Sequence, residues 1–258
     1  MAFTLEFIGT ATTLLRLGPH VLLTDPDFRR RGHYAYLGKG LFSRRRTDPA
    51  RQPADLPDLD GVLLSHLHGD HFDPVARREL DRDLPILTTS AASRKLERWG
   101  FDDARGMETW ERIELADGLA VTSVPGQHAP GPTRRLFPPV MGTVVEATRE
   151  DGSVFRLYIT GDTLNRMWLQ DVTMRLGPLD AMVIHLGGTR ALGLLVTMDG
   201  DQGADLVDRL APAVTVPVHY DDYTVFRSPL EEFLSVCRSR GVVSRIRRVG
   251  CGETIPLT

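Results

Sequence analysis

The feature that constrains this chain most is the run His-Leu-His-Gly-Asp-His at residues 66–71. In an extended segment residues i and i+2 point to the same side, so His66 and His68 can offer imidazoles to one metal ion. Gly69 lets the backbone turn, which aims Asp70 and His71 at a second ion. The run therefore predicts two neighbouring metal sites.

Three further ligand-type residues lie in short loops marked by glycine or proline: His128 in PGQH, Asp162 in TGDT and His219 in PVHY. A lone buried histidine is usually a hydrogen-bonded core residue. Four ligand-type residues within six positions, joined by three more in loops, indicate a metal-binding cluster instead. The exception would be a degenerate relative that has lost its metal.

These motifs resemble those of the metallo-β-lactamase fold superfamily, in particular the branch of ascorbate-6-phosphate lactonase and N-acyl-phosphatidylethanolamine phospholipase D. The resemblance covers nearly the whole chain, from LEFIGTATTLL at residues 5–15 and LLTDP at residues 22–26 to PVHY at residues 217–220. It implies one metal held by His66, His68 and His128. It also implies a second metal held by Asp70, His71 and His219, with Asp162 bridging the two.

The same resemblance implies an α/β (α+β) fold, a four-layer αββα sandwich of two mixed β-sheets with the ligands on loops along one edge. An internal echo agrees with it, because residues 59–65 (LDGVLLS) match residues 179–185 (LDAMVIH) in pattern. We expect a single hydrolase domain over residues 1–258, since one domain of this size is common for such folds. A rim loop is expected at about residues 28–58.

Hydrophobic alternation and turn residues predict the remaining elements. Strands are expected at residues 3–9, 12–17, 20–24, 61–65, 85–88, 119–124, 141–148, 154–160, 181–185, 214–218 and 245–248. Helices are expected at residues 74–81, 91–99, 165–176, 202–210 and 229–240. For the last helix Ser228 is the expected N-cap, Pro229 the first helical residue and Glu231 the capping-box partner.

Two metal ions that share a water can lower its pKa from about 15.7 towards ~7, which creates a hydroxide nucleophile. Asp70 would orient this hydroxide and pass its proton to the leaving group. An imidazole-rich site favours zinc, while manganese or mixed occupancy stays open. His68 stands where related diiron enzymes that reduce oxygen carry glutamate, which disfavours redox chemistry. We therefore expect a metal-dependent hydrolase with two divalent ions.

The substrate is less constrained. The segment at residues 28–46 holds six arginines and one lysine, so Arg30 and Arg31 are candidates for clamping a phosphate or carboxylate. A solvated surface loop is the alternative. His185, at a strand end, either contacts substrate or is an ordinary hydrogen-bonded residue, and Tyr220 is a weak pocket candidate. Asp25 is expected behind the ligands, where acidic residues orient ligating imidazoles.

The expected reaction is hydrolysis of a phosphodiester or a lactone or ester bond in a small anionic molecule. A thioester or other acyl hydrolase, and a metal-binding relative without hydrolytic activity, are the alternatives. The net charge of -3 gives no general attraction to nucleic acid. Neither a secretory signal nor a membrane span is recognisable, so we expect a cytoplasmic protein without integral membrane association. A homo-oligomer is compatible with the sequence.

Overall fold

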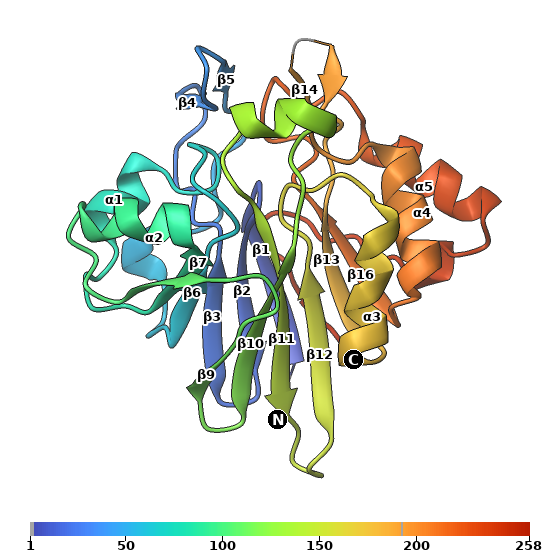
Figure 1. Ribbon diagram of the computed structural model, residues 1–258, viewed down its shortest axis with the longest axis horizontal. Helices are drawn as coiled ribbons and strands as arrows, with labels where there is room; N and C mark the ends of the chain where they lie inside the picture. Colours follow the sequence, from blue (N-terminus) through green and yellow to red (C-terminus); the bar gives the residue numbers. More distant parts are fainter. Residues whose placement is uncertain (1–2, 192) are drawn as a thin grey trace.

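Two mixed β-sheets stacked face to face form the centre of the molecule, with helices on both outer sides (Figure 1). The computed structural model describes residues 3–191 and 193–258. The strand order is β17-β1-β2-β3-β6-β7-β8 in the first sheet and β16-β13-β12-β11-β10-β9 in the second. In each sheet an antiparallel half is joined to a parallel half. The αββα prediction is confirmed.

The elements have the following bounds. The first sheet contains β1 (Phe3–Gly9), β2 (Thr12–Leu17), β3 (His20–Thr24), β6 (Gly61–Leu63), β7 (Ile86–Thr89), β8 (Ala104–Met107) and β17 (Thr254–Pro256). The second contains β9 (Arg112–Ala116), β10 (Leu119–Pro125), β11 (Met141–Thr148), β12 (Val154–Ile159), β13 (Ala181–His185) and β16 (Val214–Val218). Two small hairpins are β4 (Tyr34–Tyr36) with β5 (Phe42–Arg44), and β14 (Arg190–Ala191) with β15 (Leu194–Leu195). The α-helices are α1 (Pro74–Glu79), α2 (Ser90–Glu97), α3 (Asp171–Leu176), α4 (Gly200–Leu210) and α5 (Leu230–Ser239), and the 3-10 turns are η1 (Pro53–Asp55), η2 (Gly131–Leu136), η3 (Met167–Gln170) and η4 (Val243–Arg245).

Side-chain alternation along the strands separates three apolar layers. In β13, Ala181 and Val183 face the layer between the sheets. Met182 and Ile184 face the opposite way, into the layer under α4 and α5. A third layer lies under α1 and α2, on the outer side of the first sheet. Since both faces of each sheet are buried, the central strands are apolar on both sides.

The start of α5 differs from the sequence prediction. The helix begins at Leu230, and Pro229 is its N-cap residue without a side-chain cap. The hydroxyl of Ser228 instead donates to the Glu232 carboxylate and accepts the backbone N–H of Gly200. The predicted capping box with Glu231 is therefore wrong, because the serine joins the starts of α4 and α5.

Two other predictions need correction. The expected strand at residues 245–248 is absent: η4 ends at Arg245, and Ile246 forms only an isolated bridge with Thr215. The expected helix at residues 165–176 is divided into η3 and α3. Strand β17, which the sequence did not reveal, pairs with β1 and completes the first sheet.

The predicted rim segment at residues 28–58 is more ordered than a plain surface loop. It contains the β4–β5 hairpin and η1, and its Arg45 side chain is completely buried. The hairpin stands at the same end of the molecule as η2 and β14 (Figure 1). Within the described residues, the helices are all too short or too polar to cross a membrane.

Candidate metal centre

The ligand candidates share one edge because the strands that precede them run in one direction. Strands β12, β13 and β16 are mutually parallel, and β10 lies two antiparallel steps from β12. Their carboxyl ends therefore meet at the same side of the sheet. The residues that follow or end the strands at this edge are Asp25 after β3, His66 after β6, His128 after β10, Asp162 after β12, His185 in β13 and His219 after β16.

The first predicted triad is brought together. The Nε2 atom of His66 lies 3.0 Å from Nδ1 of His68, and Nε2 of His128 lies 3.2 Å from the same atom. All three side chains are buried. Burial lowers the pKa of His68 to about 3, and the neighbouring His128 adds to this effect. Neutral imidazoles that converge on one point are suited to bind a cation.

The outer nitrogens of two of these rings are already engaged. The His128 Nδ1 atom lies 2.7 Å from the carbonyl of Val196. Because a carbonyl only accepts, this nitrogen carries the proton and Nε2 keeps its lone pair. The Ser65 hydroxyl donates to the Asp25 carboxylate, so its oxygen accepts from His66 Nδ1. Both rings thus present an unprotonated Nε2 to the centre.

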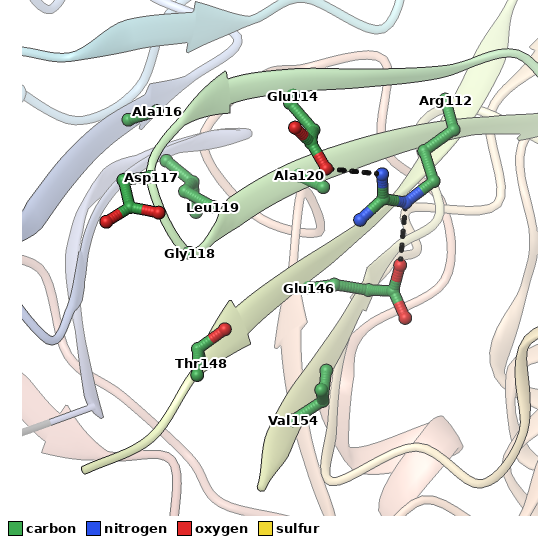
Figure 2. A pocket seen from close by; sticks show the side chains of 10 residues that line it. All are labelled: Arg112, Glu114, Ala116, Asp117, Gly118, Leu119, Ala120, Glu146, Thr148 and Val154. Carbon is green, nitrogen blue, oxygen red and sulfur yellow. Dashed lines mark hydrogen bonds and ion pairs between the residues drawn. The ribbon is translucent and has the colours of Figure 1, made fainter. Parts of the chain in front are cut away.

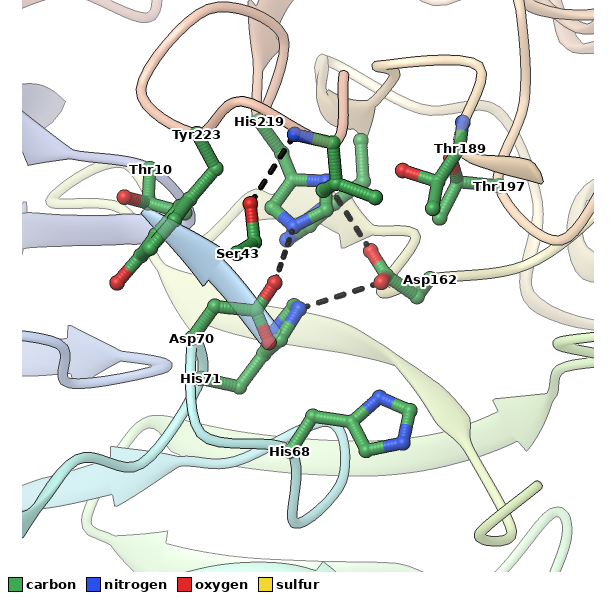
Figure 3. A network of polar contacts seen from close by, with 12 residues as sticks. Thr10, Ser43, His68, Asp70, His71, Asp162, Thr189, Thr197, His219 and Tyr223 are labelled. Atoms are coloured by element: carbon green, nitrogen blue, oxygen red, sulfur yellow. Dashed lines mark hydrogen bonds and ion pairs between the residues drawn. The ribbon is translucent and has the colours of Figure 1, made fainter. Parts of the chain in front are cut away.

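The second predicted triad also converges, and Figure 3 shows it from close by. The Nε2 atom of His219 lies 3.4 Å from Oδ2 of Asp70. Asp162 contacts members of both triads: its Oδ2 atom is 3.3 Å from His71 Nε2 and 3.9 Å from His128 Nε2. Its Oδ1 atom is 3.4 Å from His219 Nδ1. A carboxylate in this place can reach two adjacent ions.

This donor set fits divalent cations. Oδ1 of Asp70 is a buried polar atom without a hydrogen-bond partner, while Nε2 of His71 and Oδ1 of Asp162 have only long contacts with an oppositely charged group, at 3.3 and 3.4 Å. Unsatisfied buried polar atoms are costly, and so are buried carboxylates without a positive charge. Although burial lowers the pKa of His71, the Asp162, Asp25 and Asp70 carboxylates outweigh it and hold that pKa well above its usual value. The cluster therefore attracts positive charge.

Asp25 lies behind the ligands. Its Oδ1 atom accepts from the Ser65 backbone N–H at 2.8 Å, and its Oδ2 atom is 3.3 Å from His71 Nδ1. Oδ2 also lies 3.4 Å from Nε2 of His185. His185 lines none of the pockets beside the ligands; its Nδ1 atom lies 3.3 Å from the Thr160 hydroxyl. The structure therefore places this histidine behind His71 and away from the space for substrate.

Backbone strain is concentrated at the same edge. Asp25 has a φ of 34° and His219 a φ of 63°. Residues with side chains rarely adopt this left-handed region, and strained positions of this kind cluster at functional sites. The His219 backbone N–H donates to the Thr10 carbonyl at 2.8 Å, which helps to hold the strained conformation.

The other substrate candidates do not face the ligands. Arg30 lines a separate hollow with His33 and Gln52, and Arg31 is an exposed side chain. Tyr220 packs against the apolar layer under α4 and α5. The arginine clamp predicted from Arg30 and Arg31 is therefore not formed at the metal centre.

A buried ionic network that sequence reasoning missed lies beside the ligands. The Asp27 carboxylate accepts from Arg45 Nη1 at 2.6 Å and from the Tyr223 hydroxyl at 2.7 Å. The Nη1 atom of Arg29 donates to Tyr223 at 2.8 Å and to the carbonyl of Gly69 at 2.7 Å. Burial lowers the pKa of Arg45, but Asp27 outweighs it and the pKa is raised. The network connects the ligand run with the loop after His219. The only hint of this network in the sequence was Arg29, which lies two residues after Asp27.

The backbone turns at residues 69–71, as expected, and Gly69 has a second role as well. It does not adopt a positive φ. A Cβ atom at this position would lie 2.7 Å from the Tyr36 carbonyl oxygen, and the Gly69 N–H donates to that oxygen at 3.0 Å. The glycine therefore allows the β4–β5 hairpin to seat directly on the ligand run.

A narrow pocket, which we call the inner pocket, lies against the ligand candidates. Its volume is about 20 Å³, and its wall includes His68, Asp70, His128, Asp162 and His219. The other lining residues are Leu37, Leu41, Phe137, Thr189, Ala191, Val196, Thr197 and Val225. Among residues 3–191 and 193–258, no lysine or arginine lines this inner pocket. Another hollow, at the turn between β9 and β10, contains none of the ligand candidates, and its Arg112 is paired with Glu114 and Glu146 (Figure 2).

Comparison with known proteins identifies the class. Residues 20–220 match the beta-lactamase superfamily domain. YddR of Bacillus subtilis, a UPF0173 protein, is 25% identical over 96% of this chain and 97% of its own length. Other UPF0173 relatives are described as metal-dependent hydrolases. The chain spans 61% of the length of its mycobacterial relatives.

Two solved structures share the fold. A possible metal-dependent hydrolase from Veillonella parvula has a TM-score of 0.86 at 22% identity, over 99% of this chain and 100% of that one. An isothiocyanate hydrolase from Delia radicum gut bacteria has a TM-score of 0.83 at 21% identity, over 98% of both chains.

The fold and the converging His and Asp side chains define a candidate metal-binding site, and the relatives named above are described as metal-dependent hydrolases. The chain belongs to the beta-lactamase superfamily.

Proposed function

We propose that this chain is a two-metal hydrolase that cleaves a lactone or another carboxylic ester. The observation that carries the proposal is the composition of the inner pocket, which is lined by apolar side chains, two threonines and the ligand candidates, without a cation. Hydrolysis of a carbonyl compound develops one negative charge on oxygen. Phosphoryl transfer spreads more charge over several oxygens and commonly requires arginine or lysine as well as metal.

We assign His66, His68 and His128 to one ion. Asp70, His71 and His219 are assigned to the second, with Asp162 shared. Bound divalent ions supply a water of lowered pKa and polarise the carbonyl oxygen. Zinc is the expected metal, because imidazoles dominate the donor set, and manganese is the alternative.

Asp70 is the proposed proton-transfer residue. Its Oδ2 atom faces His219, while its Oδ1 atom is buried, unpartnered and close to the inner pocket. In this position Oδ1 can accept the proton of the attacking water and then deliver it to the leaving oxygen. Asp25 holds the His71 ring from behind through Nδ1, which keeps Nε2 directed towards the centre.

A second candidate reaction is isothiocyanate hydrolysis. The similar fold of an isothiocyanate hydrolase supports it, and so does the narrow apolar inner pocket, because an isothiocyanate presents an electrophilic carbon without any anionic group to bind. The motif resemblance to ascorbate-6-phosphate lactonase favours the lactone instead.

The test combines metal content with substrate class. Protein loaded with zinc or manganese is assayed on matched lactones, carboxylic esters, phosphodiesters and an aryl isothiocyanate, with Asp70→Ala as the control for contaminating activity. We expect about two equivalents of metal by mass spectrometry. Lactone turnover should fall by a factor of about 10² or more in Asp70→Ala. Phosphodiester turnover above lactone turnover would contradict the proposal, and metal content near zero in the wild type would contradict the two-metal site.

A further inference from the structure

The inner pocket adjoins a larger cavity, which we call the outer cavity. Its volume is about 540 Å³, within the usual range of ~300 to 1,000 Å³ for small-molecule sites. The two spaces share lining residues, namely Leu37, Leu41, His68, Phe137 and Ala191. A molecule in the outer cavity can therefore extend one end to the ligand cluster.

Of the residues that the structure describes, three cations line the outer cavity and no acidic residue does. Lys39 lies in the turn between β4 and β5, Lys95 on α2, and Arg190 on β14. Lys95 Nζ stands 4.9 Å from the centre of the Trp99 ring, and Arg190 donates to the Gly193 carbonyl at 3.3 Å. None of the three is paired with an acidic side chain in the part of the chain that the structure describes. Three elements thus bring uncompensated positive charge to one cavity.

The rest of the wall is mainly apolar and unusually exposed. Tyr36 is 51% exposed, Leu136 51% and Leu194 40%. Each of them lines the outer cavity and comes from a different element, β4, η2 or β15. Apolar side chains that gather around a cavity mouth mark a ligand-binding surface. The cavity therefore combines an apolar wall with positive charge.

We propose that the outer cavity binds an amphiphilic anionic substrate, an acyl ester or lactone whose apolar body carries a carboxylate or sulfonate-like group. The ester end lies beside His68, where the outer cavity adjoins the inner pocket, the apolar body lies against Leu37, Leu41 and Phe137, and the anion pairs with the three cations. This inference rests on the proposed ester hydrolysis. In this proposal the three cations of the outer cavity recognise the anion, in place of Arg30 and Arg31.

The first experiment measures turnover of γ-lactones with alkyl side chains from ethyl to octyl, each ending in a methyl or a carboxylate group. The value of kcat/KM should rise roughly fourfold per methylene until the cavity is filled. Chains that end in carboxylate should be preferred over methyl-ended chains of equal length, and added salt should reduce this preference. No dependence on chain length, or a preference for the neutral series, would overturn the inference while leaving ester hydrolysis intact.

A second experiment does not depend on turnover. Binding of octylsulfonate and of neutral octyl glucoside is measured by calorimetry in the wild type and in a variant carrying Lys39→Asn, Lys95→Gln and Arg190→Gln. Asparagine is chosen at position 39 because Lys39 has a φ of 50°, a region that asparagine tolerates. The ratio of sulfonate to glucoside affinity should fall on the order of tenfold in the variant.

Arg94→Gln is the matched control, since Arg94 is exposed on the same helix as Lys95 but does not line the cavity. The control should keep the wild-type affinity ratio. Equal ratios in the wild type and the triple variant would overturn the proposed anion site, even if none of the tested lactones is a substrate. A lowered ratio without any lactone turnover would support the anion site and contradict the ester hydrolysis.

Discussion

The buried Asp27 network provides the sharpest stability prediction. The substitution Asp27→Asn keeps the shape of the side chain and one acceptor oxygen but removes the charge. Arg45 and Asp27 have side chains that are 0% exposed, and Arg29 is only 9% exposed. The variant would therefore leave two buried guanidinium groups without a carboxylate. Removing one partner of a buried ion pair typically costs about 3–5 kcal/mol.

A control for this prediction exists on the surface. Asp103 is paired with Arg105 at 2.6 Å, the same distance as in the Asp27–Arg45 pair, but its side chain is 34% exposed and that of Arg105 is 38% exposed. Solvent screens such a pair, so Asp103→Asn should cost less than about 1 kcal/mol. Both variants replace an aspartate that is paired with an arginine by asparagine. They differ in whether that pair is buried.

Urea unfolding of the metal-free proteins measures both costs, because bound metal would add its own stabilisation. For a chain of this size, each kcal/mol shifts the Tm by about 2–4 °C, so Asp27→Asn should lower the Tm by about 10 °C. The slope of unfolding free energy against urea should stay unchanged. If Asp27→Asn costs no more than Asp103→Asn, the network does not act as a buried ion pair and the reasoning is refuted.

Three other predictions concern the centre itself. Gly69→Ala forces the Tyr36 backbone away from the run of ligand candidates, so it should lower the Tm by several degrees and weaken zinc binding; Gly250→Ala, whose added Cβ would meet only the Glu253 carboxylate at 3.4 Å and whose φ is not positive, should leave zinc affinity unchanged. His185→Gln should weaken metal binding by about tenfold, measured by competition with a chelating dye, without raising KM, since His185 lies behind His71; a raised KM alone would show that it contacts substrate. Zinc titrated into chelator-treated protein should bind to about two equivalents, and at a hundredfold excess over Kd each site should add about 2.7 kcal/mol to the free energy of unfolding and so raise the Tm; a Tm independent of zinc would refute metal binding by the folded state.

The convergence of the ligand candidates was predictable because most of them are local and repetitive in sequence, whereas their binding of metal stays a prediction. The residues His66, His68, Asp70 and His71 lie within one short run, and the loops of His128 and His219 carry turn residues that mark the ends of apolar strands. Strand alternation also sufficed for most strands of the two main sheets, but the edge strands β8, β9 and β17 were not predicted. These features depend on short segments of sequence.

Longer-range pairings were not predictable. Tyr223 and Asp27 are far apart in sequence, and nothing in their local context indicates that they are hydrogen-bonded. Arg45 looked like one of a run of exposed cations, and only the fold reveals that it is buried. The failed capping box at Ser228 has the same cause, because its hydroxyl is used by another helix start.

The seating of the β4–β5 hairpin on Gly69 has a consequence for redesign of this enzyme. The turn of the hairpin contributes Leu37 and Lys39 to the wall of the outer cavity, while the Tyr36 carbonyl accepts the Gly69 N–H in the run of ligand candidates. Val196 combines the same two tasks, since its side chain lines the inner pocket and its carbonyl fixes the His128 tautomer. Substrate preference and metal affinity are therefore not independent traits. Mutations that reshape the wall must be selected together with metal retention.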